Sequence, residues 1–514
     1  MVSRVYTGVL TGLTAHKVTT EVDVNNSLPS VIIVGLPDTA VSEAKERVRS
    51  AIKNSGYSFP AKKITVNLAP ADIRKEGSAY DLPIAIGILS VDGIINCEKC
   101  EEYAFIGELS LDGSLRPVAG VLPLVSGLKE LGIKNIIVPF ENAKEAALIE
   151  NINVYGAKHL YDVVNHFIDD AECAKPLEKT FFDIKEYMAC ENSDFPFDFK
   201  DVKGQFKAKK ALEIAAAGGH NILMSGSPGS GKTLLAKCFA SILPPPEPSE
   251  AIELTKIYSI SGLIDSEHPL VTKRPFRTVH HTASSVGIIG GGSNPKPGEI
   301  TLAHRGILFF DEVVEFPRQV LEVLRQPLED GEIVISRAQT SIKYPAKFIF
   351  VGAMNPCPCG YYGDKEKACT CSEYQIQKYR SKISGPLLDR IDIQIEVPRL
   401  KADELIGGKF ESESSEEIRK RVIKARDIQL KRYKGLGIYT NSELTPKLIK
   451  QFCKLDEQSE TILKMAGRKF NISGRGYDRL LKLARTIADL AGAENITAAH
   501  ISQALQYRNF VENT

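Results

Sequence analysis

The chain has 514 residues, which is too many for one hydrophobic core and predicts roughly two to four domains. Its 65 basic and 64 acidic residues nearly cancel, so any binding to nucleic acid or membrane must come from local patches. No apolar run reaches the length of a membrane span, and the N-terminus is a poor secretory signal. Ten cysteines without a disulfide-scaffold pattern favour a reducing, cytoplasmic location.

Strand-like runs alternate with helical patterns over residues 1–172, which predicts a separate N-terminal domain of mixed α/β type. Residues 39–54 place apolar side chains at helical spacing. Residues 173–200 lack periodicity and are rich in Glu, Lys, Asp, Phe and Pro, which is typical of a linker. The runs with strand-like composition are Ser30–Gly35, Lys63–Leu68 and Asn135–Pro139.

The next predicted domain, residues 201–400, carries the most specific motif of the chain. Residues 226–233 read GSPGSGKT and fit the phosphate-binding P-loop at every required position, between the strand-like run 221–225 and the helical run 234–242. In such a loop, glycines let backbone N–H groups close on a polyphosphate at a helix N-terminus. Lysine then reaches the β- and γ-phosphates and the hydroxyl of Ser or Thr ligates Mg²⁺. The predicted residues for ATP and Mg²⁺ are Gly226, Ser227, Pro228, Gly229, Ser230, Gly231, Lys232 and Thr233.

Two apolar strands downstream of this loop end in polar side chains. Residues 306–312 end in Asp311 and Glu312, which are placed to hold Mg²⁺ through water and to polarise an attacking water. Residues 347–355 end in Asn355, whose amide suits the orientation of a water near the γ-phosphate. The alternatives are a solvated acidic turn and an ordinary turn asparagine. Together the three side chains predict ATP hydrolysis in addition to binding.

Arginines in two later segments are candidates for the same site. Arg390 precedes a predicted strand, and Arg475 and Arg479 lie where a helix begins. An arginine near the γ-phosphate supplies charge that a P-loop lacks, although a surface ion pair is the ordinary role of any single arginine. The last predicted domain, residues 401–514, is expected to be helical, and the acidic run 411–417 near its start is expected to be a turn or linker.

The order of these motifs resembles that of AAA+ ATPases, namely Walker A, Walker B, a sensor-1 Asn, an arginine finger and a sensor-2 Arg. Residues 276–284 and the glycine-rich run 287–298 resemble the helix-2 insert of the magnesium chelatase-like branch. Residues 326–338 resemble its pre-sensor-1 β-hairpin. Over nearly its whole length the chain resembles the ComM/YifB subfamily of this branch.

This resemblance implies both an architecture and residue roles. The expected fold class is α/β multidomain, with a Lon-protease-like (S5-type) α+β N-terminal domain, an AAA+ P-loop α/β core and a C-terminal helical lid. Asn355 would be sensor 1, Arg390 a finger acting in trans on a neighbouring subunit, and Arg475 sensor 2, with Arg479 as its competitor.

The N-terminal domain resembles the proteolytic domain of Lon in two segments, residues 75–83 and 107–120. When these are aligned by their glycines, the positions of Lon's catalytic Ser and Lys hold Ala79 and Leu122. A Ser–Lys dyad needs a hydroxyl and an amine in contact, so peptide hydrolysis is not expected. We interpret this domain as structural or ligand-binding.

Four cysteines follow the sensor asparagine closely, in two C-x-C pairs. Four thiolates converging on one loop suit tetrahedral Zn²⁺, and a metal would order a loop too short to have its own core. The alternatives are reduced thiols without metal and a redox pair. The separate C-x-x-C at residues 97–100 has no second pair nearby and predicts nothing. The candidate zinc ligands are Cys357, Cys359, Cys369 and Cys371.

Three features favour DNA as the substrate. The hairpin predicted over residues 332–344 presents Arg337, Gln339 and Lys343 near its tip, which suits contact with a phosphate backbone. The glycine-rich insert contributes Lys296. The helix predicted to begin at residue 418 is strongly basic, although a solvated face paired with the acidic run before it is an equally good interpretation.

The resemblance implies a homo-oligomer, a hexamer, that acts on single-stranded or branched DNA. The implied activity is that of an ATP-driven helicase that promotes branch migration of recombination intermediates in natural transformation. A chelatase-type ATPase that loads metal and an AAA+ chaperone or unfoldase are the alternatives. Against an unfoldase, residues 283–304 contain no Phe, Tyr or Trp that could grip a peptide. No membrane partner is expected.

Overall fold

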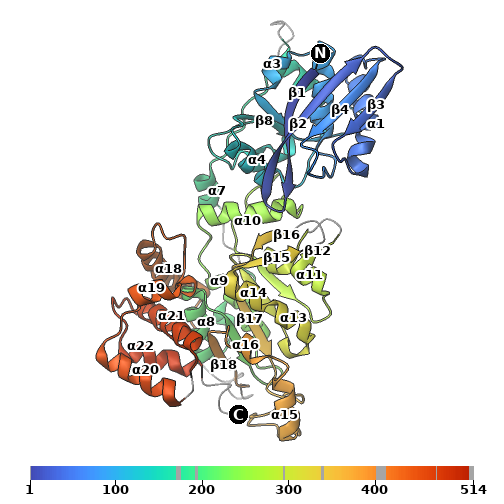
Figure 1. Ribbon diagram of the computed structural model, residues 1–514. Helices are drawn as coiled ribbons and strands as arrows, with labels where there is room; N and C mark the ends of the chain where they lie inside the picture. Colours follow the sequence, from blue (N-terminus) through green and yellow to red (C-terminus); the bar gives the residue numbers. More distant parts are fainter. Residues whose placement is uncertain are drawn as a thin grey trace. The chain divides into compact units, whose positions relative to one another are not determined.

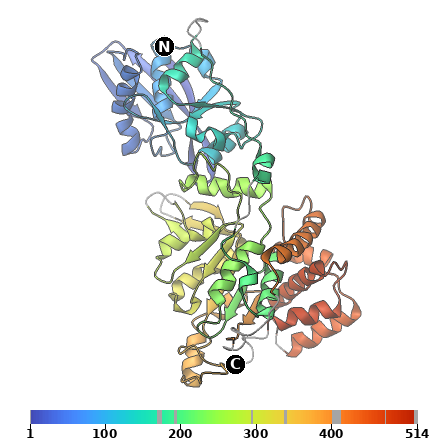
Figure 2. The ribbon, with the colours of Figure 1, turned by 180° about the vertical axis from the view of Figure 1, so that it is seen from behind.

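The computed structural model describes residues 2–168, 175–190, 195–292, 296–336, 341–400, 412–469 and 472–508. The chain folds as two compact units, and it passes from one unit to the other three times (Figures 1 and 2). Unit 1 comprises Met1–Glu191 and Glu247–Thr272, and unit 2 comprises Asn192–Pro246 and Lys273–Thr514. None of the helices within the described ranges combines the length and apolar character that a membrane span needs.

Unit 1 is built on a mixed seven-stranded sheet. Its strands, in sheet order, are β3 (Ser30–Val34), β4 (Lys63–Ala69), β2 (Thr14–Asn25), β1 (Val2–Thr11), β5 (Tyr103–Phe105), β8 (Asn135–Pro139) and β9 (Asn153–Ala157). The pairs β1–β2 and β2–β4 are antiparallel, and the remaining neighbours are parallel. The strands predicted from composition are therefore confirmed as β3, β4 and β8.

Helices cover this sheet, and a short hairpin accompanies them. The helices of unit 1 are α1 (Thr39–Asn54), α2 (Asp81–Val91), α3 (Cys97–Cys100), α4 (Val121–Glu130), η1 (Phe140–Asn142), α5 (Ala143–Ala146), α6 (Leu160–Phe167), α7 (Ile184–Cys190) and α10 (Pro248–Ile260). The hairpin pairs β6 (Glu108–Leu109) with β7 (Leu115–Arg116). Helix α1 occupies the predicted range because Val41, Ala44, Val48 and Ile52 form one buried stripe and Asp38 caps its N-terminus.

The division into units differs from the predicted domains in two places. Helix α10 lies in sequence between parts of the predicted ATPase domain but belongs to unit 1, because Ala251 packs into the apolar cluster that contains Leu122 of α4. Ser259 of α10 also donates a hydrogen bond to the buried carboxylate of Glu145. Part of the predicted linker forms α7, and Tyr187 packs on the same cluster.

Unit 2 contains a five-stranded, all-parallel sheet. In sheet order the strands are β11 (Phe276–Val279), β14 (Ile307–Phe310), β17 (Ile349–Met354), β10 (Ile222–Ser225) and β18 (Ile393–Glu396). Every residue of β10, β14 and β17 is buried, as expected of parallel strands covered on both faces. The register places Ile222 of β10 opposite Val351 of β17 and Ile393 of β18.

The other elements of this core include two β-hairpins. The first pairs β12 (Gly290–Gly291) with β13 (Lys296–Pro297), and the second pairs β15 (Glu332–Ser336) with β16 (Ser341–Pro345). They lie within the insert and the hairpin that the sequence predicted. The helices are η2 (Phe199–Asp201), α8 (Phe206–Gly218), α9 (Lys232–Ile242), α11 (Ser285–Ile289), α12 (Glu299–Leu302), η3 (Val313–Glu315), α13 (Arg318–Val323), α14 (Arg325–Asp330), α15 (Glu373–Arg380) and α16 (Gly385–Leu388).

The C-terminal part of unit 2 is helical, as predicted. It consists of α18 (Ser415–Arg432), η4 (Asn441–Glu443), α19 (Pro446–Phe452), α20 (Glu457–Lys469), α21 (Gly474–Leu490) and α22 (Ala498–Gln506). Helices α18 and α21 pack against α8 of the core and share one apolar cluster with the sheet (Figure 1). Buried Asp489 ties these helices together, because it pairs with Arg432 at 2.5 Å and with Arg485 at 3.0 Å.

Candidate nucleotide site

The P-loop joins the end of β10 to the start of α9, at the carboxyl edge of the parallel sheet, where open α/β sheets bind ligands. Its glycines are required by geometry. A Cβ atom on Gly226 would lie 2.2 Å from the carbonyl oxygen of Val397. Gly229 and Gly231 have positive φ angles of 76° and 91°, which suit glycine best. The sequence therefore builds a tight loop that leads directly into a helix N-terminus.

Lys232 is the cation at the centre of the loop. Its Nζ donates hydrogen bonds to the carbonyl oxygens of Gly226 at 2.6 Å and Ser227 at 3.1 Å, and it lies 3.4 Å from Oδ1 of Asn355. Burial lowers the pKa of Lys232 to about 8, although the nearby carboxylates of Asp311 and Glu312 oppose that shift. The site thus holds a desolvated ammonium group directly beside Asn355.

Asp311 and Glu312 directly follow β14, which is separated from β10 in the sheet by β17. The Thr233 hydroxyl donates a 2.9 Å hydrogen bond to Oδ2 of Asp311, and the backbone N–H of Glu312 donates to Oδ1 of the same side chain at 3.0 Å. Glu312 follows with a φ of 51°, a left-handed conformation that is uncommon outside glycine. The structure therefore brings Lys232, Thr233, Asp311 and Asn355 together, with Glu312 next in the chain.

One arginine from each of the two later segments, Arg390 and Arg475, pairs with Glu329, an acidic residue that the sequence did not single out. Arg390 is 6% exposed and pairs through Nη2 with Glu329 of α14. Arg475 has a 66% exposed side chain and pairs with the other oxygen of Glu329 at 2.7 Å. Arg479 instead lies 3.6 Å from Asp392 and is largely buried. None of the three pairs with a P-loop residue in the ranges that the structure describes.

Asn221, just before β10, connects the P-loop strand to the Arg390 segment. Its Nδ2 donates to the carbonyl oxygen of Arg390 at 3.1 Å, and its Oδ1 accepts from the backbone N–H of Phe350 at 2.9 Å. Its own N–H donates to Asp392 at 3.1 Å. Burial alone would raise the pKa of Asp392, but His220 and Arg479 hold it well below its usual range. The sequence offered no local motif for these contacts.

The candidate DNA-binding residues lie on the two hairpins. Arg337 and Gln339 fall outside the described residues. Lys343 on β16 is exposed and pairs with Glu332 at 3.0 Å, and Lys296 on β13 is exposed. The hairpins adjoin, because a Cβ on Gly290 of β12 would lie 2.9 Å from Cδ1 of Ile335 on β15.

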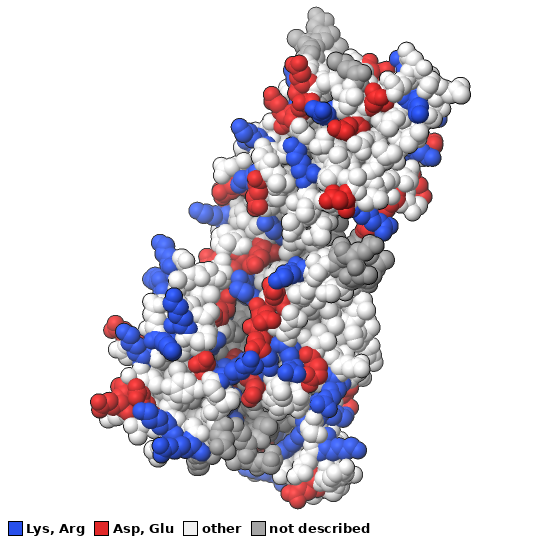
Figure 3. All heavy atoms as spheres, in the orientation of Figure 1, with Lys and Arg blue, Asp and Glu red and all other residues white. Residues whose placement is uncertain are grey.

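Two basic side chains of α18 are paired with acidic groups. Arg421 pairs with Glu213 at 2.6 Å and with Glu413 at 2.8 Å, and Lys420 pairs with Glu416 at 2.7 Å. These pairs favour the interpretation of α18 as a solvated, charge-paired face. On the side seen in Figure 3, basic and acidic side chains are interspersed in the same way.

The two positions that the sequence alignment with Lon singled out, Ala79 and Leu122, hold apolar side chains in unit 1. Leu122 is fully buried and Ala79 packs against the same cluster. The adjacent hydroxyl of Ser78 donates to Glu108, and the buried ammonium of Lys75 donates to the carbonyl oxygen of Pro70. The two groups are thus bonded to different partners.

The four cysteines of the two C-x-C pairs come together in unit 2. Their sulfur atoms all lie within 4.8 Å of one another. Three of these thiols are partly exposed, and Cys357 is buried. This cluster begins two residues after Asn355.

Comparison with protein families places most of the chain among magnesium chelatase-related sequences. A family described as magnesium chelatase, subunit ChlI, matches residues 198–405. Subunit ChlI of Mg-chelatase matches residues 20–142, and the ChlI C-terminal family matches residues 412–508. The parallel sheet of unit 2 is consistent with this AAA+ type of fold.

Some curated relatives match this chain over almost its entire length, and others match only part of it. Competence protein ComM of Haemophilus influenzae is 43% identical over 99% of this chain and 97% of its own. YifB of Escherichia coli is 42% identical over 98% and 97%, respectively. The magnesium-chelatase 38 kDa subunit of Cereibacter sphaeroides is 28% identical over only 31% of this chain and 53% of its own. The chain therefore belongs to the ComM/YifB subfamily of magnesium chelatase-like AAA+ ATPases.

Proposed function

We propose that this protein hydrolyses ATP as a subunit of a hexameric ring that moves branched or single-stranded DNA. The observation that carries the ATPase part is the joint placement of Lys232, Thr233, Asp311 and Asn355 at one sheet edge. Full-length similarity to a protein named for competence supports action on DNA during natural transformation.

The geometry within one chain supports the following proposed roles. Lys232 binds the β- and γ-phosphates, in place of the loop carbonyls that now accept from its ammonium. Thr233 and Asp311 fit Mg²⁺, which when bound neutralises phosphate charge. Asn355 orients the attacking water and Glu312 accepts its proton.

Arg390 and Arg475 are proposed to serve the same nucleotide, that of a neighbouring subunit. Both guanidinium groups rest on the single carboxylate of Glu329, so this cluster carries a net positive charge. A γ-phosphate presented from outside is the anion that such a cluster attracts. The side chain of Arg479 is largely buried beside Asp392, whereas that of Arg475 is exposed, which supports Arg475 for the sensor-2 role.

DNA is proposed to contact the two adjoining hairpins. Lys296 and Lys343 are exposed on their strands, and the sequence places Arg337 and Gln339 between β15 and β16. Exposed cations on hairpins suit a phosphate backbone and carry no base specificity. The paired cations of α18 are not assigned to DNA.

ATPase activity with and without nucleic acid tests the proposal. The purified protein should hydrolyse ATP faster with single-stranded DNA or a four-way junction than alone. If neither these nor duplex DNA binds at low salt with ATP present, an alternative role would take precedence. The first alternative is a chelatase-type metal-loading ATPase, which the family matches to ChlI support. The second alternative is an AAA+ unfoldase.

A further inference from the structure

The four cysteines have the dimensions of a metal site. Sγ of Cys357 lies 3.4 Å from that of Cys359 and 3.7 Å from that of Cys369, and the latter two are 3.5 Å apart. Tetrahedral zinc with Zn–S bonds of about 2.3 Å requires sulfur separations of about 3.8 Å. A disulfide would need about 2.05 Å. Cys357, Cys359 and Cys369 therefore have the spacing of ligands around one ion and not that of an oxidised pair, and Sγ of Cys371 lies within 4.8 Å of the other three.

Backbone donors surround these sulfurs as they surround thiolates. The N–H of Tyr362 lies 3.3 Å from Sγ of Cys357, and the N–H of Cys359 lies 3.4 Å from Sγ of Cys371. The N–H of Cys371 in turn lies 3.4 Å from Sγ of Cys369. Such second-layer donors stabilise the negative charge of a tetrathiolate centre and fix its ligands.

We propose that residues 357–371, the cysteine loop, bind one Zn²⁺ through four thiolates and thereby support the P-loop. Binding releases the thiol protons and forms four Zn–S bonds, with no redox change. The metal part of this proposal is independent of any action on DNA. The nucleotide part rests on ATP binding at the P-loop.

Contacts between the cysteine loop and the P-loop carry the second half of the proposal. Gly360 has a φ of 84°, and a Cβ on it would lie 2.7 Å from Cδ of Pro228. The Ser227 hydroxyl lies beside the Asp364 carboxylate and holds the pKa of that acid below its ordinary value. A loop fixed by metal thus presses its backbone against the middle of the nucleotide loop.

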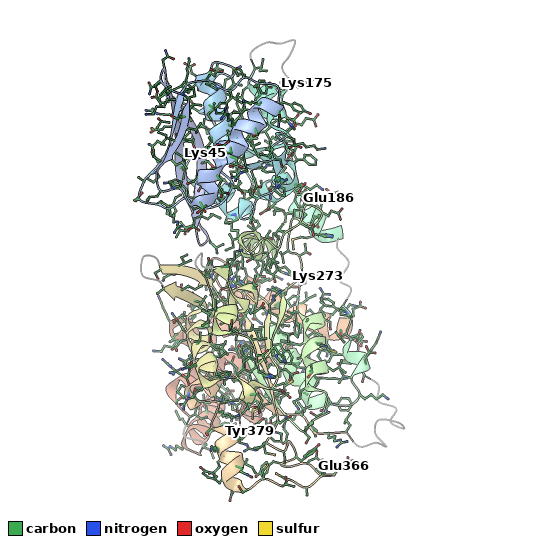
Figure 4. All side chains as sticks on the ribbon, turned by 90° about the vertical axis from the view of Figure 1, so that its right-hand side faces the viewer. Lys45, Lys175, Glu186, Lys273, Glu366 and Tyr379 are labelled. Atoms are coloured by element: carbon green, nitrogen blue, oxygen red, sulfur yellow. The ribbon has the colours of Figure 1, made fainter. Side chains whose placement is uncertain are left out.

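The far side of the cysteine loop is held by α15. Nε of Arg380 donates to the carbonyl oxygen of Pro356 at 3.2 Å, and its guanidinium lies over the ring of Tyr362. Figure 4 labels Glu366 of the loop and Tyr379 of α15 at the same end of unit 2. With the loop anchored at both sides, the metal is the remaining fixed point in its middle.

Metal content is the first measurement. The full-length protein, purified without chelator and dialysed against EDTA, should retain about one zinc per chain, since structural zinc binds tightly. The double variant Cys369→Ser/Cys371→Ser should retain almost none, whereas Cys97→Ser, a partly exposed thiol outside the cluster, should keep its zinc. Absence of zinc from the wild type after incubation with ZnCl₂ would overturn the metal site.

Nucleotide affinity is the second measurement, made with a fluorescent ADP analogue. The zinc-free double variant should bind it about tenfold more weakly, which is the effect expected of a distorted packing contact. Wild-type affinity in a folded, zinc-free variant would overturn the link to the P-loop.

A glycine pair tests that link even where the cysteine variant does not fold. Gly360→Ala retains all four ligands but places a methyl group against Pro228. Gly363→Ala is its matched control, because Gly363 has a similar φ of 78° and a Cβ there would meet only Glu396, at 3.6 Å. Gly360→Ala should keep zinc and lose nucleotide affinity, whereas Gly363→Ala should keep both. Equal affinities in the two variants would overturn the support role.

Discussion

Two charged clusters of unit 2 differ in whether the charged groups of one chain balance one another. At the carboxyl edge of β10, β14 and β17, the polar side chains of one chain bond to one another. Lys232 donates to loop carbonyl oxygens and lies beside Asn355, and Thr233 donates to Asp311. At Glu329, two guanidinium groups share one carboxylate, and one of them is largely exposed. The first cluster can bind a nucleotide by itself, whereas the second has spare positive charge for an anion from outside.

This contrast predicts how variants behave in isolation and in mixtures. Loss of a residue in the first cluster damages the subunit that carries it. On the proposed function, loss of an arginine in the second cluster should damage the neighbouring subunit whose nucleotide that arginine serves.

Glu312→Gln should lower the rate of ATP hydrolysis by about 10²–10⁴-fold, the range for loss of a general base. Its affinity for ATP should be nearly unchanged, because the hydrogen bonds that Lys232 and Thr233 donate among the described residues go to other partners than Glu312. Steady-state turnover and nucleotide titration measure the two effects.

Glu315→Gln provides the control for that substitution. Glu315 lies in η3, three residues further on, and pairs loosely with Lys382 at 3.7 Å on the surface. Its turnover should equal that of the wild type. Wild-type turnover in Glu312→Gln as well would refute the role given to Glu312.

Arg390→Ala should lower turnover by about 10²–10³-fold, as for loss of a charged group that stabilises a transition state. Mixed with Lys232→Ala subunits, it should regain activity, because some interfaces then pair an intact P-loop with an intact Arg390. Each variant assayed alone at the same total concentration is the control. A co-assembled mixture without regained activity would show that Arg390 acts within its own subunit.

Arg337→Ala/Lys343→Ala should weaken DNA binding and flatten its salt dependence, by about one counterion per lost phosphate contact. ATP binding without DNA should remain unchanged. Lys420→Ala on α18 is the matched control, because it removes an exposed lysine that is already paired with Glu416. If the control and the hairpin variant were weakened equally in DNA binding, the hairpin could not be the DNA-binding element.

Nucleotide binding should take up protons at alkaline pH. The pKa of Lys232 is lowered to about 8 by burial, so part of the ammonium is deprotonated at pH 8.5. Phosphate groups favour the charged form and raise that pKa, so ADP binding at pH 8.5 should be accompanied by uptake of a fraction of a proton. At pH 6.5 the group is already charged and no uptake should occur. Calorimetry in two buffers of different ionisation enthalpy measures this; equal uptake at both pH values would contradict it.

Motifs that are local in sequence could be predicted, because their physical requirements are local. The P-loop needs a strand, glycines and a helix in immediate succession, and β10, Gly226–Gly231 and α9 supply them. The sulfur cluster was also predictable, since all four thiols lie on one short loop.

Contacts between distant segments could not be predicted in the same way. Glu329 precedes its partner Arg390 by 61 residues, and no periodicity in α14 marks it as a ligand for arginine. Asn221 reads as the first residue of a strand, yet it bonds to Arg390 across 169 residues. The packing of Gly360 on Pro228 is likewise invisible in the sequence, because it depends on how two loops fold against each other.

Migration of a four-way DNA junction tests the central claim most directly. Wild-type protein with ATP should convert a labelled junction into its products, and omission of ATP or the substitution Glu312→Gln should prevent conversion while junction binding persists. Conversion at equal rates with wild type and Glu312→Gln, or wild-type protein that hydrolyses ATP yet leaves every junction intact, would contradict an ATP-driven motor on branched DNA.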